Sequence, residues 1–227
     1  MGIRQRRLTS GCSRRASRAA FSGTWLLYCC PRFVAFRHDR ARLNRKPLGL
    51  MKITLDHNCI IHLANQTDIG ARIQEIVSRK ENECFVVNIG ASEMREKGVH
   101  PDHYEKFEEL LDLARIADLP RLNPMAIWNV TFWDKHVWAD DTMIKLAADI
   151  EQVLFGKAQK IDIAAEGLDS PAGRKWLNRL CDVHSMWCHI YSKNDVFLTT
   201  DGNFTKETKM PRLIVLGAGR ICHPHAL

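Results

Sequence analysis

The first 50 residues lack acidic side chains almost entirely, and they lack any long apolar run. They hold 12 Lys and Arg residues against the single acid Asp39, whereas residues 51–227 hold 21 basic and 25 acidic residues. The net charge of +7 therefore divides into +11 for the first segment and −4 for the second. The longest apolar run of the first segment, residues 25–30, is far shorter than the roughly 20 residues of a membrane span and the about 7–15 of a secretory signal. Both are excluded for this segment, and we expect no membrane association.

The same segment shows no helical or strand periodicity that could build a core. We therefore predict a basic, disordered extension over residues 1–50 and a folded domain over residues 51–227. Three interpretations of the extension stay open: translation that starts at Met51, an Arg-rich transit peptide, and a basic arm that binds nucleic acid. Under the transit-peptide interpretation the protein would be organellar.

The cysteine spacing does not match a disulfide framework, and the glycine pattern does not match a common nucleotide-binding motif. Of eight cysteines, five fall in residues 51–227, an odd number without disulfide-like spacing. This favours a reducing, cytoplasmic setting with cysteines as small core side chains. The motifs G-x-G-x-x-G and G-x-x-x-x-G-K-[ST] are absent, which argues against the common dinucleotide-binding and P-loop folds.

What the chain does contain is an alternation of strand-like and helix-like segments. Apolar runs predict strands, and apolar side chains at helical spacing predict helices. The expected strands are residues 52–55, 84–87, 195–198 and 213–216; the expected helices include residues 69–77, 104–114, 143–154 and 172–192. This order is typical of βαβ units, so the fold class is α/β with a parallel sheet covered on both faces.

One stretch, residues 119–140, shows little periodicity but holds three tryptophans, Trp128, Trp133 and Trp138. We predict an irregular connection that covers part of the sheet. Buried aromatics are the commoner use of such residues, so we expect these rings in the core rather than as stacking platforms for nucleic acid.

Two of the predicted strands end in an acid. Asp56 follows the first, and Asp201 lies just beyond the strand at residues 195–198. Glu93 falls in the short helix after the second strand, and Asp182 falls in the long helix that leads to Asp201. Parallel strands end at one edge of their sheet, where ligands bind, so we expect these acids to meet there. The fit is closest if that helix begins near residue 181, and looser if it begins at residue 172.

Each of these acids also has a purely structural interpretation. Asp56 could cap a helix, a position for which Asn58 competes, and Asp201 before Gly202 could be a turn residue. Asp182 could be a solvated helix position, and Glu93 an acid favoured by the dipole of a helix's first turn. Their conjunction, rather than any single residue, favours a site.

The segments around these acids resemble the PIN-domain family of metal-dependent nucleases. The matching residues are Leu55-Asp56-His57-Asn58 with Ile60-Ile61, Ser92-Glu93-Met94, Asp182, and the run from Leu198 to Phe204. The resemblance implies a Rossmann-like α/β/α sandwich with Asp56, Glu93, Asp182 and Asp201 as ligands of Mg²⁺ or Mn²⁺. It places Thr199 at a hydroxyl position before the last acid and Asn203 near the metals, with Asn58 in support.

The resemblance also implies a function, an endoribonuclease acting on RNA. Small stand-alone members resemble toxins, so an antitoxin protein and a homodimer are expected partners. The chain departs from compact members over residues 100–172, where Asp140, Asp141 and Glu166 are further candidate acids.

The chemistry fits the residue types. Clustered carboxylates raise one another's pKa, and divalent ions remove that penalty. Such ions can activate water and stabilise the leaving oxygen of a phosphodiester. Basic residues nearby in the sequence are candidates for holding phosphates: Arg95, Lys97, Lys206, Lys209 and Arg212.

Three alternatives remain beside this hypothesis. Cys181, His184, Cys188 and His189 have spacings that suggest zinc, but their apolar neighbours indicate packing. A non-catalytic RNA-binding or scaffold protein would keep the fold without the reaction. A metal-dependent phosphatase could use Asp56 at a strand end in a similar way.

Overall fold

The computed structural model describes residues 49–94, 103–156, 161 and 163–227, which belong to one compact unit, residues 46–227. The predictions for residues 1–48 lie outside the described residues. The strands are β1 (Met51–Leu55), β2 (Asn82–Val87), β3 (Arg121–Leu122), β4 (Val196–Leu198) and β5 (Arg220–Cys222). The helices are α1 (His57–Ala64), α2 (Asp68–Ser78), α3 (Gly90–Glu93), α4 (Glu105–Leu113), α5 (Asp141–Phe155), α6 (Ile163–Glu166), α7 (Pro171–Tyr191), α8 (Gly202–Thr205), α9 (Met210–Val215) and the 3₁₀ turn η2 (Pro224–Ala226). Within the described ranges, no helix combines the length and apolar character needed to cross a bilayer.

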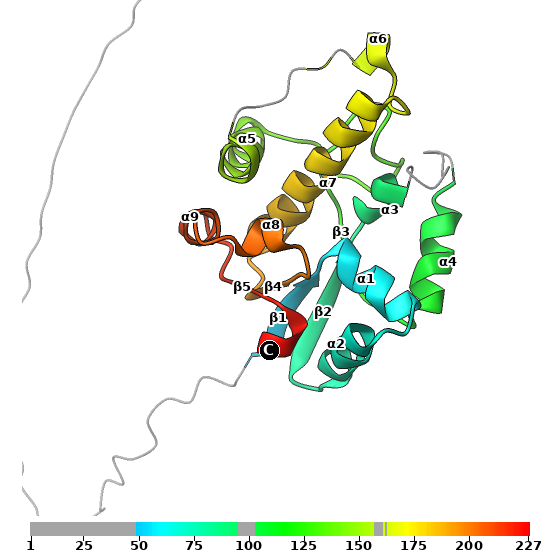
Figure 1. The fold of residues 1–227 in the computed structure, drawn as a ribbon, viewed down its shortest axis with the longest axis vertical. Helices are drawn as coiled ribbons and strands as arrows, with labels where there is room; N and C mark the ends of the chain where they lie inside the picture. The colour runs from blue at the N-terminus through cyan, green and yellow to red at the C-terminus, as the bar shows by residue number, and fades with distance from the viewer. Residues whose placement is uncertain (1–48, 95–102, 157–160, 162) are drawn as a thin grey trace, which may run out of the picture. The chain divides into compact units, whose positions relative to one another are not determined.

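The five strands form one parallel sheet in the order β3-β2-β1-β4-β5. Helices cover both faces, so the predicted Rossmann-like α/β/α sandwich is confirmed (Figure 1). The central strand β1 places Leu55 opposite Val86 on one side and Leu198 on the other. Because all strands run the same way, their carboxyl ends share one edge of the sheet.

The alternation of side chains along β1 explains the two layers. Ile53 and Leu55 are fully buried in a cluster with residues of α1, α2 and α4, on the right of the sheet in Figure 1. Thr54 points the other way, where His189 of α7 contacts it. A second apolar cluster joins α5, α7 and α9 to that opposite face. Both faces of the sheet are therefore buried, as parallel sheets require.

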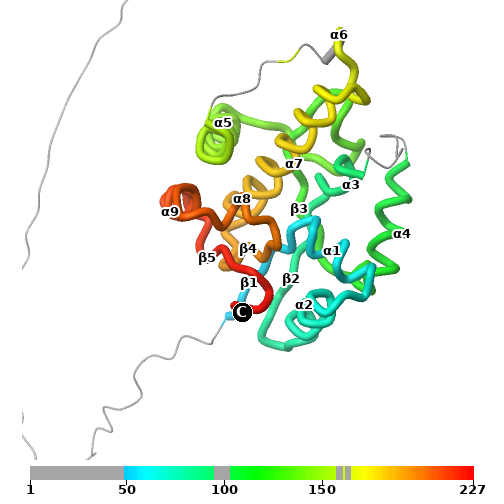
Figure 2. Tube along the Cα trace, in the orientation of Figure 1, coloured from blue at the N-terminus to red at the C-terminus, as the bar shows by residue number. Residues whose placement is uncertain are grey.

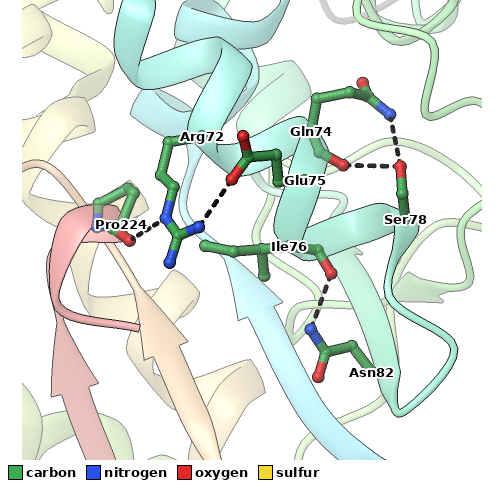
Figure 3. A network of polar contacts seen from close by, with 7 residues as sticks. All are labelled: Arg72, Gln74, Glu75, Ile76, Ser78, Asn82 and Pro224. Carbon is green, nitrogen blue, oxygen red and sulfur yellow. Dashed lines mark hydrogen bonds and ion pairs between the residues drawn. The ribbon is translucent and has the colours of Figure 1, made fainter.

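Polar contacts join helix α2 to η2 and to the start of β2 (Figure 3). Arg72 pairs with Glu75 through Nη1 at 2.7 Å, and its Nε donates to the Pro224 carbonyl of η2 at 3.4 Å. Asn82, at the start of β2, donates its side-chain Nδ2 to the Ile76 carbonyl at 2.7 Å. The bond from Arg72 to Pro224 links α2 to the chain that follows β5, and the bond from Asn82 links it to β2.

The predicted last strand over residues 213–216 is wrong. That run belongs to α9, in which Leu213 is fully buried while Val215 is 86% exposed. An apolar run of this length suits a strand or a helix, and Pro211 in the first turn of α9 favours the helix. The strand comes later: Gly219, with φ +57°, turns the chain into β5, and Ile221 is buried there.

The connection over residues 119–140 differs from the expectation in two ways. It contributes the short edge strand β3, which the sequence pattern did not indicate. Its tryptophans are not in the core: Trp128, Trp133 and Trp138 are 84%, 75% and 74% exposed. The buried apolar side chains of this segment include Met125 and Val130, which lie in one apolar cluster, and Phe132, which lies in the other.

Candidate active site

Asp56 and Thr199 stand side by side at the carboxyl edge of the sheet. The parallel ladder continues one residue past the strands, since Asp56 N donates to the Leu198 carbonyl at 3.0 Å and Thr199 N to the Cys222 carbonyl at 3.1 Å. Thr199 Oγ1 then donates to Asp56 Oδ2 at 2.7 Å, and Asp56 Oδ1 accepts from His57 N at 2.9 Å. Both side chains are buried, so the carboxylate is held in one orientation.

Asp201 is joined to the same hydroxyl. Its backbone N–H donates to Thr199 Oγ1 at 3.0 Å, and its own Oδ1 accepts from Asn203 N at 2.8 Å at the start of α8. The prediction that Asp56 and Asp201 meet at one edge is therefore confirmed. Asp56 also caps helix α1, as its structural interpretation predicted, and Asp201 caps helix α8. A carboxylate oxygen has a second lone pair, which leaves capacity for a ligand.

Asp182 faces these two acids from the middle of α7. Burial and the charges of Asp56 and Asp201 together raise its pKa to about 8, against the opposing effects of Lys209 and Asn203. The long helix begins at Pro171, which is the case in which the sequence predicted the looser fit.

The length of α7 resolves this difference. Its 21 residues span about 30 Å at 1.5 Å per residue, whereas β4 has three residues and spans about 10 Å. The helix therefore extends past the strand, and its midpoint lies level with the carboxyl edge. A mid-helix position is the one that brings Asp182 to the other acids.

The negative charges of the three carboxylates repel one another. Burial raises the pKa of Asp56 to about 6, with Asp201 adding to the rise and the bonds from Thr199 and His57 opposing it. The donors are oxygens only, which suits Mg²⁺ or Mn²⁺ rather than a soft metal. In the part of the chain that the structure describes, no three His, Cys, Asp or Glu side chains converge closely enough to hold one ion. The acids thus raise one another's pKa without gathering round a common point.

Lys209 supplies a positive charge that acts on Asp182 and Asp201. Its Nζ donates to Asn203 Oδ1 and to the Leu154 carbonyl at the end of α5. Burial and Lys206 lower its pKa, while Asp201 and Asp182 act to raise it. Of the basic residues considered from sequence, Lys209 is thus at the acids, whereas Lys206 and Arg212 are exposed. Arg95 and Lys97 lie outside the described residues.

Glu93 is less directly connected to the other acids. It ends α3 and is half-buried, and α3 packs against α7, where Cys181 Sγ contacts the Ile89 carbonyl at 3.9 Å. Its role as a fourth ligand stays a prediction. Asn58 lies half-buried in the first turn of α1.

The remaining candidate acids have other positions. Asp140 caps α5 by accepting from Met143 N at 2.8 Å, and hydrogen bonds, that from Thr142 first, lower its pKa. Asp141 and Glu166 are exposed on α5 and α6. These three residues show no connection to the carboxylate cluster in the contacts of the described chain.

The histidines and cysteines of α7 fill the core. Cys181, His184, Cys188 and His189 are all buried. His189 contacts Thr54 Oγ1 through Nδ1 at 2.9 Å and the Ala218 carbonyl through Nε2 at 2.7 Å, so both ring nitrogens serve to join α7 to the sheet. The five cysteines that the structure describes are buried, and none of these five forms a disulfide.

Comparisons of this chain with protein-family models, with curated proteins and with solved structures find no match. The resemblance to PIN domains therefore rests on the motifs alone.

Proposed function

We propose that this chain is a Mg²⁺- or Mn²⁺-dependent endoribonuclease with a PIN-like site. The observation that carries the proposal is the link between Asp56 and Asp201 through Thr199 at the carboxyl edge of the sheet, where ligands bind. Asp182 of α7 adds a third acid, whose pKa is raised by burial and by the charges of the other two. A divalent cation is the natural partner of such a group, because it removes their mutual repulsion.

The residues have distinct roles in this proposal. Asp56, Asp182 and Asp201 would hold the ions, with Glu93 as a fourth predicted ligand. When bound, the ions would supply activation of water and stabilisation of the leaving oxygen in an in-line displacement. Thr199 positions the Asp56 carboxylate through its 2.7 Å hydrogen bond.

Lys209 and Asn203 act at the rim of the cluster. Lys209 offers a positive charge that can move from the carboxylates to the phosphate of a substrate once cations neutralise the acids. Asn203 holds that ammonium through Oδ1. Ion loading therefore converts an edge that repels phosphate into one that attracts it.

The test is cleavage of end-labelled single-stranded RNA by the full chain in Mn²⁺ or Mg²⁺, with EDTA as the metal-free arm. Asp201→Asn and Asp182→Asn should each reduce cleavage by about 100-fold or more, since each removes a charged ligand. Asp141→Asn is the matched control, because this acid is exposed on α5 and should cleave like the unchanged chain. Equal cleavage by all four proteins would reject the proposal.

The same assay separates the alternatives. A phosphatase would release phosphate from a phosphomonoester and leave internal bonds intact. A scaffold protein would bind RNA without cutting it in any metal. An antitoxin partner and a homodimer stay predictions that follow from the resemblance, and a cytoplasmic location stays a prediction that follows from the cysteine pattern.

A further inference from the structure

The exposed tryptophans of the connection between β3 and α5 surround a cavity of about 410 Å³. Its walls include Trp128, Asn129, Phe132, Trp133, His136 and Trp138. Large aromatic side chains that gather on the surface instead of packing in the core often mark a binding site. We name this feature the tryptophan pocket.

Two successive tight turns build the pocket and place a tryptophan at each corner. In the first, Val130 N donates to the Ile127 carbonyl at 3.1 Å, with Trp128 second and Asn129 third at φ +59°. The second repeats this arrangement: Lys135 N donates to the Phe132 carbonyl at 3.2 Å, with Trp133 second and Asp134 third at φ +58°. Asn and Asp are the side chains that best tolerate this left-handed conformation.

The turns stand on a rigid base. Val130 and Phe132 are buried, and the Val130 carbonyl accepts from Ser92 Oγ of α3 at 2.8 Å. The two ends of the segment are clamped together, since Ala126 N donates to the Val137 carbonyl at 2.9 Å. The pocket is therefore formed before any ligand arrives, which lowers the cost of ordering it on binding.

The rings are set in a fixed order, with His136 between two tryptophans. The ring centroids lie 6.1 Å from Trp133 to His136 and 5.2 Å from His136 to Trp138. The Phe132 carbonyl can only accept, so His136 Nδ1, 2.9 Å away, must donate to it, which fixes the orientation of the imidazole. Their planes are tilted by 56° and 82°, so the three rings support one another, and the exposed tryptophans offer aromatic surface to a planar group.

The charge around the pocket selects among planar ligands. Among the described residues, none that lines the cavity is acidic. The charged side chains next to it in the second turn are Asp134 and Lys135, and neither lines the cavity. Because no Asp, Glu, Lys or Arg is part of its wall, the cavity favours a neutral planar ring, such as a nucleobase, over an organic cation.

The segment that builds the pocket starts at the edge of the sheet that carries the acids. Its segment follows the carboxyl end of β3 and runs past α3 and α7 to α5 (Figure 2). The bond from Ser92 joins it to α3, the helix that ends at Glu93. A strand of nucleic acid lying along this edge would pass both features.

We propose that the tryptophan pocket binds unpaired nucleobases of a single-stranded nucleic acid by stacking. Under the proposed function, on which this part of the inference rests, that strand is the RNA substrate on its way to Asp56 and Asp201. Stacking uses the face that every base has, so the pocket holds single strands with little preference for sequence.

The test is the affinity of the full chain for a labelled single-stranded oligouridylate in EDTA, measured by fluorescence anisotropy. The basic residues 1–50 add an electrostatic contribution, so the titration is run at about 0.3 M salt, where that contribution is weak. Trp133→Ala and Trp138→Ala should each weaken binding by about 5- to 100-fold. Trp133→Phe keeps an aromatic face and should retain most of the affinity.

The matched control is Tyr191→Ala, an aromatic side chain that is 53% exposed on α7 and does not line the pocket. It should bind the oligonucleotide like the unchanged chain. A base-paired duplex of the same sequence should bind less tightly, because its base faces are covered.

The outcomes for the pocket and for the nuclease are separate. Tryptophan-dependent binding without cleavage in Mn²⁺ would support the pocket and reject the nuclease. Cleavage with affinity unchanged in the tryptophan variants would support the nuclease and overturn the pocket. Binding of a duplex as tight as that of a single strand, or no binding of any oligonucleotide, would also overturn the pocket.

Discussion

Thr199 Oγ1 donates a 2.7 Å hydrogen bond to Asp56 Oδ2 across the two central strands of the sheet. Thr199 is fully buried, and its hydroxyl also accepts from Asp201 N at 3.0 Å. One side chain thus sets the positions of two carboxylates from segments that lie 145 residues apart in the sequence. The site depends on this hydroxyl before any metal is considered.

Thr199→Val removes the hydroxyl and keeps the shape of the side chain. It leaves a buried carboxylate oxygen without its donor, so we expect the free energy of unfolding to fall by about 1–3 kcal/mol. Cleavage should fall as well, since Asp56 loses its orientation. Denaturant unfolding measures the first effect and the RNA assay the second. Thr199→Ser keeps the hydroxyl and should restore most of both, and a valine variant as active as the unchanged chain would contradict this role.

The pKa of Asp182 predicts how pH affects stability without metal. Because the folded pKa, about 8, lies above the ordinary value of 3.8, the folded state binds the proton more tightly than the unfolded state. Stability is therefore lost as pH rises towards and through 8. Between pH 6.5 and 8, the unfolding free energy should decrease on the order of a few kcal/mol. Asp182→Asn should flatten this slope, and an unchanged slope in the variant would refute the assignment.

Added Mn²⁺ should reverse this loss, because the ion replaces the proton as the partner of the carboxylates. We expect the rise in melting temperature on adding Mn²⁺ to be larger at pH 8 than at pH 5.5, where protons compete for the same oxygens. Asp201→Asn should reduce the rise, while Asp141→Asn should preserve it. A rise that is equal at both pH values would count against binding at these acids.

His184 predicts the opposite pH effect at lower pH. Burial lowers its pKa to about 4, and within the described chain its Nδ1 has no hydrogen-bond partner. Because the folded pKa lies below the ordinary 6.5, stability present above pH 6.5 is lost as pH falls towards 4, by about 3 kcal/mol in all. His184→Leu should remove this part of the acid sensitivity and be neutral or stabilising at pH 7. If unfolding of the variant keeps the full pH dependence, another group is responsible.

Gly219 should resist substitution. Its φ of +57° disfavours side chains, and a Cβ there would lie 2.5 Å from the backbone oxygen of Asp195. Gly219→Ala should lower the unfolding free energy by about 1–3 kcal/mol. Gly202→Ala is the matched control, because a Cβ at that position meets nothing within 4 Å. Similar stability losses in the two variants would contradict this account of the turn into β5.

The sequence predicted the strands that carry Asp56 and Asp201 because their apolar runs are short and end in polar residues. It failed for residues 213–216, where an equally apolar run forms α9. Local hydrophobicity does not distinguish these cases; the glycines that follow, with Gly219 at positive φ, do. Strand β3 was missed because two residues carry no periodic signal.

The sequence predicted only part of the candidate site. Sequence order indicated that Asp56 and Asp201 leave the same edge, but the place of Asp182 depended on the length of α7 relative to β4. Burial of the tryptophans was predicted from residue type, and this was wrong for all three, Trp128, Trp133 and Trp138. Trp128 and Trp133 each precede Asn or Asp in a left-handed turn, a signal that the sequence carries and that could have indicated exposed corners.

The most direct test of the metal site is a crystal of the full chain soaked in Mn²⁺, with anomalous diffraction measured at the manganese edge. We predict manganese peaks at carboxylate oxygens of Asp56, Asp182 and Asp201, and loss of the peak at residue 201 in Asp201→Asn. No peak at these oxygens under saturating Mn²⁺, or a peak that persists unchanged in the variant, would contradict the account.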